Sequence, residues 1–269
     1  MLFWQSVLRF LDASMETPEP YGWFHLAWLA LSVLAIVPLK KWAKNPQKVI
    51  WFTAVAVTLL EVYKQINYSF SYTEGISFDY QWYAFPFQFC STPMYVGLLA
   101  GLVKPGKLRD SLWAYLATYA LFAGLSVMVY PVSVFISTIG VNLQTMICHG
   151  SMITVGVYLL CTGAVKPELK TLWRAVPVFG VCLVLAVGMN EVAHATGLLE
   201  RETFNMFFVS PYCEPSLPVY SLVQGAVAYP WCLMIYILGF TAAAGLVLLA
   251  AKGALKLTKK KTAQSCSQS

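Results

Sequence analysis

The chain has 269 residues, of which 58% are hydrophobic and only 11% are charged, and its mean hydropathy is +0.64. Soluble globular domains carry about twice that share of charged residues, so this composition excludes an ordinary soluble domain and indicates a membrane protein. The net charge is +6. Because the basic residues collect at the ends of apolar stretches, this charge gives no reason to expect a nucleic-acid partner.

Seven apolar stretches are long enough to cross the ~30 Å hydrocarbon core of a bilayer as helices of roughly 20 residues. In chain order they are Trp23–Leu39, Val49–Ser71, Phe85–Val103, Leu112–Val134, Leu143–Cys161, Trp173–Ala193 and Pro230–Ala251. The sequence therefore predicts an all-α, polytopic membrane protein with seven transmembrane helices. We expect a single transmembrane domain over residues 1–255 and a basic, disordered tail over residues 256–269.

Basic residues are distributed unevenly between the two ends of these helices. Of the 18 Lys and Arg residues, 15 follow the first, third, fifth or seventh stretch. They are Lys40, Lys41, Lys44, Lys48, Lys104, Lys107, Arg109, Lys166, Lys170, Arg174, Lys252, Lys256, Lys259, Lys260 and Lys261. Since cytoplasmic loops carry the excess of Lys and Arg, the sequence predicts a cytoplasmic C-terminus and an N-terminus outside.

A cysteine and a histidine stand out within the apolar stretches. Cys90 lies in the segment Phe-Pro-Phe-Gln-Phe-Cys-Ser (residues 85–91), and His149 follows 59 residues later. Both of their stretches run in the same direction and both residues fall near the outer ends, so we expect them at a similar depth. Pro86 suits a first helical position, which would place Cys90 near the positive end of a helix dipole and favour its thiolate.

A base at the same depth would complete a nucleophile–base pair, which is the arrangement that activates a catalytic cysteine. A lone buried cysteine is more often a packing group. Cys148 adjoins His149 in sequence but leaves a helix about 100° away, so it is not expected to share the pair.

Other polar side chains also fall in the outer half of the predicted helices. They include His25, Glu61, Lys64, Gln65, Asn67, Asn190, Glu191 and His194. Such groups usually face the bundle interior or a water-filled cavity, so the sequence predicts a cavity open toward the outer leaflet. Glu61 and Lys64 are also three residues apart, so an alternative is that they neutralise each other along one helix face.

The segment of residues 85–91, followed at this interval by Cys148-His149-Gly150-Ser151, resembles the YwaF-like family of seven-span membrane proteins. This family includes transmembrane protein 164 of animals. The N-terminal Met15–Tyr21 and His25 are similar to the bacterial branch, so the resemblance implies a multi-pass protein of a bacterial cytoplasmic membrane. It also implies an acyltransferase that acts on phospholipid, with a cysteine nucleophile and a histidine on different helices.

Cys90 and His149 match those two positions. The animal relative is implicated in fatty-acyl transfer to lysophospholipid, notably ether lipids, so phospholipid and lysophospholipid substrates are expected. Cys90 would attack the donor ester to form a thioester, and an acceptor hydroxyl deprotonated by His149 would then collect the acyl chain. Supporting roles, as oxyanion donor, orienting group or substrate contact, are expected from Gln88, Asn142, Glu61, Asn190 and Glu191.

No cofactor is expected, because the thioester retains the energy of the ester. No metal site is expected either, because the cysteines and histidines lack metal-ligand spacing. Two alternatives remain. A lipid hydrolase would use the same pair with water as the acceptor, whereas a transporter or solute-binding protein would use Glu61, Lys64, Asn190 and Glu191 as a path and Cys90 as packing. Against transport, the two halves of the sequence show no internal repeat.

Overall fold

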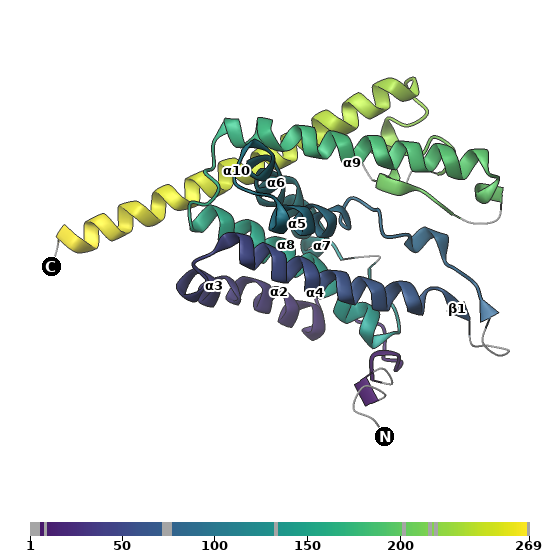
Figure 1. Cartoon of the computed structure of the whole chain (residues 1–269), viewed down its shortest axis with the longest axis horizontal. Helices are drawn as coiled ribbons and strands as arrows, with labels where there is room; N and C mark the ends of the chain where they lie inside the picture. Colours follow the sequence, from purple (N-terminus) through teal and green to yellow (C-terminus); the bar gives the residue numbers. More distant parts are fainter. Residues whose placement is uncertain are drawn as a thin grey trace.

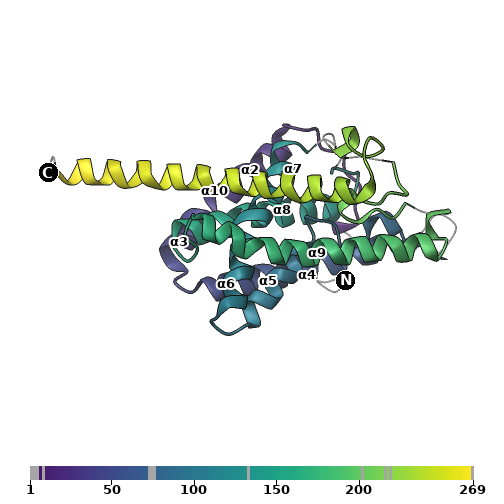
Figure 2. The ribbon, with the colours of Figure 1, turned by 90° about the horizontal axis from the view of Figure 1, so that it is seen from above.

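The computed structural model describes residues 6–7, 10–71, 77–131, 134–200, 203–214, 217 and 220–267. These residues are mainly helical, with one short antiparallel hairpin. The α-helices are α2 (Trp23–Leu34), α3 (Ile36–Trp42), α4 (Pro46–Asn67), α5 (Thr92–Leu102), α6 (Lys107–Tyr115), α7 (Leu121–Val129), α8 (Ile139–Cys161), α9 (Leu169–Ala195) and α10 (Tyr229–Ser267), and a π-helix, η2 (Leu116–Ala120), joins α6 to α7. Short 3-10 turns are η1 (Trp82–Ala84), η3 (Leu198–Glu200), η4 (Met206–Phe208) and η5 (Tyr220–Leu222). The two strands are β1 (Phe70–Ser71) and β2 (Ser77–Phe78). Figures 1 and 2 show a bundle from which α10 projects at the C-terminal end.

Six helical segments of the described chain are long and apolar enough to cross a membrane. They are Trp23–Trp42, Pro46–Asn67, Lys107–Val129, Ile139–Cys161, Leu169–Ala195 and Tyr229–Thr258. The prediction of an all-α membrane protein is therefore confirmed, and these segments correspond to six of the seven predicted stretches. The count of seven spans is not confirmed, because the remaining stretch, Phe85–Val103, is helical only over the 11 residues of α5.

The position of a second proline explains this difference. The prediction began the helix at Pro86, which would have placed Pro93 in the helix interior. There Pro93 would lack an N–H for the backbone ladder, and its ring would clash with the carbonyl of Phe89. The structure instead begins α5 at Thr92, with Pro93 in the first turn, where a missing N–H costs nothing. Residues 85–91 consequently run as turns and extended chain before α5.

The turns that carry the lysines meet at one end of the bundle. Gln47 at the start of α4 donates to the carbonyl of Gly101 near the end of α5, at 2.9 Å. Tyr158 near the end of α8 donates to the carbonyl of Ala43 between α3 and α4, at 2.6 Å. These two bonds bring the turn between α3 and α4, the end of α5 and the end of α8 to the same end of the bundle.

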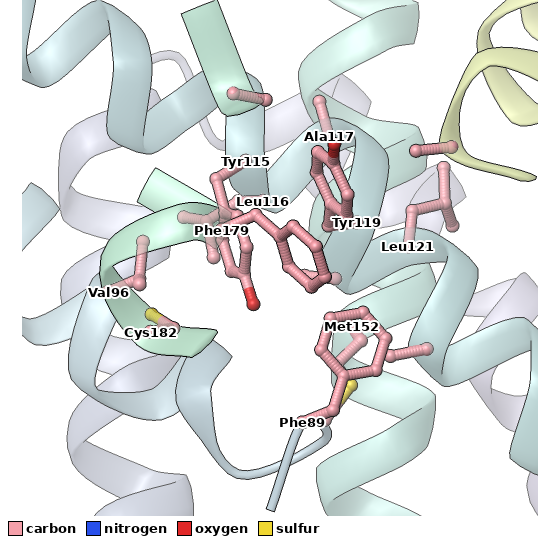
Figure 3. Close-up of a cluster of buried hydrophobic side chains, with 14 of the residues drawn as sticks. Phe89, Val96, Tyr115, Leu116, Ala117, Tyr119, Leu121, Met152, Phe179 and Cys182 are labelled. Atoms are coloured by element: carbon pink, nitrogen blue, oxygen red, sulfur yellow. The ribbon is translucent and has the colours of Figure 1, made fainter. Parts of the chain in front are cut away.

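The core lies around the segment formed by α6, η2 and α7, which the other helices surround. Tyr119 stacks on Phe179 of α9 with ring centroids 4.5 Å apart, and Phe89 meets Phe179 edge-on at 5.7 Å. Figure 3 shows these rings together. In a membrane bundle such rings stabilise the fold by close van der Waals packing. Since Phe89 directly precedes Cys90, the core fixes the position of the cysteine.

The last helix is longer than the predicted final span. α10 contains 39 residues and continues from Tyr229 to Ser267, through most of the predicted tail. The division into a membrane domain over residues 1–255 and a tail over residues 256–269 remains a prediction.

Candidate active site

Cys90 lies in a turn immediately before α5, and hydrogen bonds from α5 hold this turn. The Thr92 hydroxyl donates to the carbonyl of Phe89 at 2.8 Å, and the Tyr95 hydroxyl donates to the carbonyl of Pro86 at 2.8 Å. Phe89 itself is buried among the rings of α9 and α10. Cys90 is therefore outside the helix that the sequence predicted, but it still lies at the positive end of that helix's dipole.

A buried loop between α9 and α10 packs against the Cys90 turn, and two amide side chains fasten it. Gln88 donates to the carbonyl of Asn205 at 2.9 Å and accepts from the N–H of Phe207 at 2.9 Å. Asn190 makes the same two-sided contact with Met206, at 3.0 and 2.8 Å. Phe207 has φ +58°, in the left-handed region that a bulky residue rarely adopts, so these contacts hold strained backbone.

Two other predicted supporting residues contact different groups. Asn142 accepts from the N–H of Ile136 at 3.0 Å and donates to its carbonyl at 2.6 Å, which fixes the turn before α8. Glu191 is exposed and accepts from the hydroxyl of Tyr212 at 2.9 Å. In the described part of the chain, the hydrogen bonds of Asn142 and Glu191 thus lead away from Cys90 and His149.

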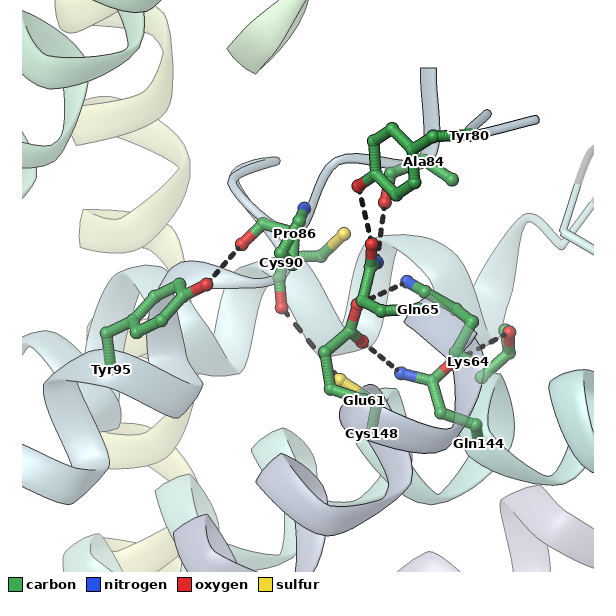
Figure 4. A network of polar contacts seen from close by, with 11 residues as sticks. Glu61, Lys64, Gln65, Tyr80, Ala84, Pro86, Cys90, Tyr95, Gln144 and Cys148 are labelled. Carbon is green, nitrogen blue, oxygen red and sulfur yellow. Dashed lines mark hydrogen bonds and ion pairs between the residues drawn. The ribbon is translucent and has the colours of Figure 1, made fainter. Parts of the chain in front are cut away.

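Glu61 is the centre of a buried polar cluster beside the Cys90 turn (Figure 4). Glu61 is buried, with 5% of its surface exposed. Its carboxylate accepts hydrogen bonds from Lys64 at 2.9 Å, from Gln65 at 2.8 Å and from Gln144 of α8 at 2.7 Å. The expectation that Glu61 and Lys64 neutralise each other is therefore confirmed. Burial, and then the Glu61 carboxylate, raise the pKa of Tyr80 to about 12, so its hydroxyl stays protonated and donates to Gln65.

This cluster connects Cys90 with α8. Cys90 lies beside the cluster in Figure 4, and Gln144 joins the cluster to α8. The Cys148 sulfur lies 4.0 Å from the Cys90 carbonyl oxygen, so Cys148 faces the Cys90 turn. Sequence reasoning gave no role to Gln144 or Cys148. Their spacing of four residues places them on one face of α8, and this signal would have predicted a shared neighbour.

His149 is 7% exposed and lies on the adjoining face of α8. Its Nδ1 lies 2.7 Å from the carbonyl oxygen of Thr145. Because a carbonyl oxygen can only accept, Nδ1 carries the hydrogen and Nε2 presents a lone pair. Within the described residues, Nε2 has no hydrogen-bond partner, so it is not hydrogen-bonded to Cys90 in this structure. The imidazole is therefore held in the tautomer that a general base requires.

A glycine on α7 provides the close packing at this level. A Cβ built at Gly124 would lie 2.7 Å from the backbone oxygen of His149. Only a residue without a side chain therefore allows α7 to approach α8 here. This contact fixes the backbone that carries the imidazole.

Comparison with known proteins gives one match. A model of the TMEM164 family matches residues 19–250. This range includes the Cys90 turn, the Glu61 cluster and His149. No curated protein and no solved structure matches the chain.

Proposed function

Because the chain belongs to the TMEM164 family of membrane proteins, we propose that it is a phospholipid acyltransferase with Cys90 as nucleophile and His149 as base. The observation that carries this proposal is the tautomer of the His149 imidazole, which leaves the Nε2 lone pair available. Nδ1 of His149 is fixed on Thr145, and the lone pair of Nε2 is buried without a partner among the described residues. Catalytic contacts in resting enzymes are often longer than in the reacting complex, so the lack of a hydrogen bond to Cys90 is compatible with this role.

In the first half of the reaction, Nε2 of His149 takes the proton of the Cys90 thiol. The thiolate attacks the ester carbon of a donor phospholipid and forms a tetrahedral oxyanion. The carbon–oxygen bond of the ester then breaks, the lysolipid leaves with the proton from His149, and the acyl chain remains on Cys90 as a thioester.

In the second half, His149 removes the proton from a hydroxyl of an acceptor lysophospholipid. The resulting oxygen attacks the thioester, and the thiolate leaves and recovers its proton from His149. Gln88 lies two residues before Cys90, and its amide nitrogen has a second N–H besides the one given to Asn205. We assign this N–H to the oxyanion. Asn190 acts as a positioning residue by holding the loop that Gln88 contacts.

Intact-protein mass spectrometry tests the covalent intermediate. Incubation of the purified protein with a donor phospholipid, without acceptor, should add the mass of one acyl group. Hydroxylamine should remove this mass, because thioesters are cleaved by it, and Cys90→Ala should not acquire it. Lipid turnover that proceeds at the normal rate with no adduct on quenched samples would contradict the thioester mechanism.

The proposal also includes an orientation, with the C-terminus in the cytoplasm and the Cys90 turn toward the outside. Three basic turns lie at the same end of the bundle as the start of the projecting part of α10, and cytoplasmic loops carry such excess positive charge. A single cysteine placed after Ser269 in a background without other exposed thiols should react with an impermeant reagent only in permeabilised cells. A cysteine at Asp79 should react in intact cells. The reverse labelling would place the Cys90 turn on the cytoplasmic side.

A further inference from the structure

A cavity of about 300 Å³ lies at the lysine-rich end of the bundle, opposite the end that holds Cys90. The starts of α6 and α9 and the turn after α8 surround it. Gly163 builds this turn with φ +76°, a conformation that favours glycine, and the chain after it reverses to line the cavity. α9 begins at Leu169, so the positive end of its dipole is directed toward the cavity.

The charges around the cavity leave two cations available. Arg174 pairs with Asp110 at 3.2 Å, and this ion pair uses one positive and one negative charge of the lining. Lys166 and Lys170 are exposed and line the cavity, and neither makes an ion pair with any residue that the structure describes. Glu168 is the remaining acid of the lining. The local field therefore favours an anion.

Two neighbouring buried N–H groups, one on a residue that lines the cavity and one just behind it, lack an acceptor among the described residues. Trp113 is 8% exposed and lines the cavity, yet its Nε1 has no acceptor among the residues described. The Arg109 guanidinium lies over the Trp113 ring, 4.6 Å from its centroid, and its Nε is likewise buried and without an acceptor in the described chain. Buried N–H groups in folded proteins nearly always have an acceptor. Two unpaired N–H groups side by side therefore point to a ligand rich in acceptor oxygens.

We infer that this cavity binds a phosphate group, carried either by a phospholipid headgroup in the adjacent leaflet or by a free phosphate compound. Lys166 and Lys170 supply the charge, and Trp113 supplies an N–H donor to the phosphate oxygens, with the Arg109 guanidinium adding positive charge behind its ring. The site is separate from Cys90 and His149, so it does not depend on the proposed acyl transfer.

Binding to the full-length protein in detergent tests the inference, with dihexanoyl phosphatidic acid and inorganic phosphate as two separate probes. Lys166→Ala/Lys170→Ala should weaken binding about tenfold or more, because two charge-assisted contacts are lost. Trp113→Phe keeps the ring and removes the N–H, so it should weaken binding by a smaller factor. The matched control is Lys40→Ala/Lys44→Ala, which removes the same charge from exposed positions at the same end but outside the cavity.

The two probes distinguish the sources of the phosphate. Tight binding of the lipid alone supports a headgroup site, and comparable binding of both probes supports a free phosphate compound. The inference is overturned if the wild-type protein binds neither probe more tightly than about 1 mM. It is also overturned if the Lys40/Lys44 control loses as much affinity as Lys166→Ala/Lys170→Ala, since the attraction would then belong to the whole surface. Thermal unfolding of each variant verifies that it is folded.

Discussion

Cys90→Ala should abolish acyl transfer and leave the protein folded. The substitution removes the thiol that is proposed to carry the acyl group. It changes little volume at a half-buried turn that Phe89 and Thr92 hold, so the free energy of unfolding should fall by only about 1 kcal/mol. Transfer is measured in mixed micelles from a labelled diacyl donor to a lysophospholipid acceptor, with the monodispersity of each variant verified.

Cys148→Ala is the matched control for this experiment. Cys148 is a second buried thiol within 4.0 Å of the Cys90 carbonyl, but it is not proposed to react, so this variant should retain most of the activity. Near-normal transfer by folded Cys90→Ala would make the cysteine a packing residue. Labelled free fatty acid in place of the diacyl product would identify a hydrolase that uses the same pair.

His149→Asn extends the same experiment to the base. The asparagine amide can still donate to the Thr145 carbonyl, but it lacks the Nε2 lone pair. Activity should fall about as far as in Cys90→Ala, and the double variant should be scarcely worse than either single variant, because groups that act as one unit are not additive.

Glu61→Leu should destabilise the protein more than any exposed substitution, by about 3–5 kcal/mol. Its carboxylate accepts three hydrogen bonds inside the bundle, and its loss leaves the Lys64 ammonium and the Gln144 amide without their acceptor. Thermal and denaturant unfolding in detergent measure the effect, with the folded helical signal as the readout.

The double variant Glu61→Leu/Lys64→Met distinguishes the cost of an unpaired buried charge from the cost of changed side-chain packing. Replacing both charges with apolar side chains removes the unpaired charge, so it should recover most of the lost stability. Glu61→Gln is the near-isosteric control and should fall between the wild type and Glu61→Leu. Equal stability of Glu61→Leu and the wild type would show that water reaches the cluster and solvates Lys64.

The helical membrane fold could be predicted from the sequence because it depends on local properties. Long apolar stretches predicted seven spans, and six of them correspond to helices long enough to cross a membrane. The error at Phe85–Val103 has a local cause as well. Two prolines seven residues apart each suit a helix start, and hydropathy does not indicate which one the chain uses. The cost of a proline in a helix interior favours the start at Pro93, and Phe89 packs into the aromatic core from the turn that results.

Among the site residues, local contacts were predictable from the sequence and long-range contacts were not. The pairing of Glu61 with Lys64 follows from their spacing and was predictable, whereas the bond from Gln144 spans 83 residues and was not. Depth along the helices directed attention to Cys90 and His149, whose pairing remains a proposal. The contacts of Gln88 with Asn205 and of Asn190 with Met206 depend on a loop that folds back into the bundle. Hydrophobic periodicity in the sequence does not predict a loop that folds back in this way.

That loop has a consequence for biosynthesis. The backbone partners of Gln88 are Asn205 and Phe207, which follow it by 117 and 119 residues. A ribosome that adds about 5–20 residues per second needs on the order of 10 s to supply them. Until then the Cys90 turn enters the membrane with polar groups that lack their final partners, a costly state in hydrocarbon. A nascent chain that stalls before residue 203 should therefore be a preferred substrate for membrane quality-control proteases.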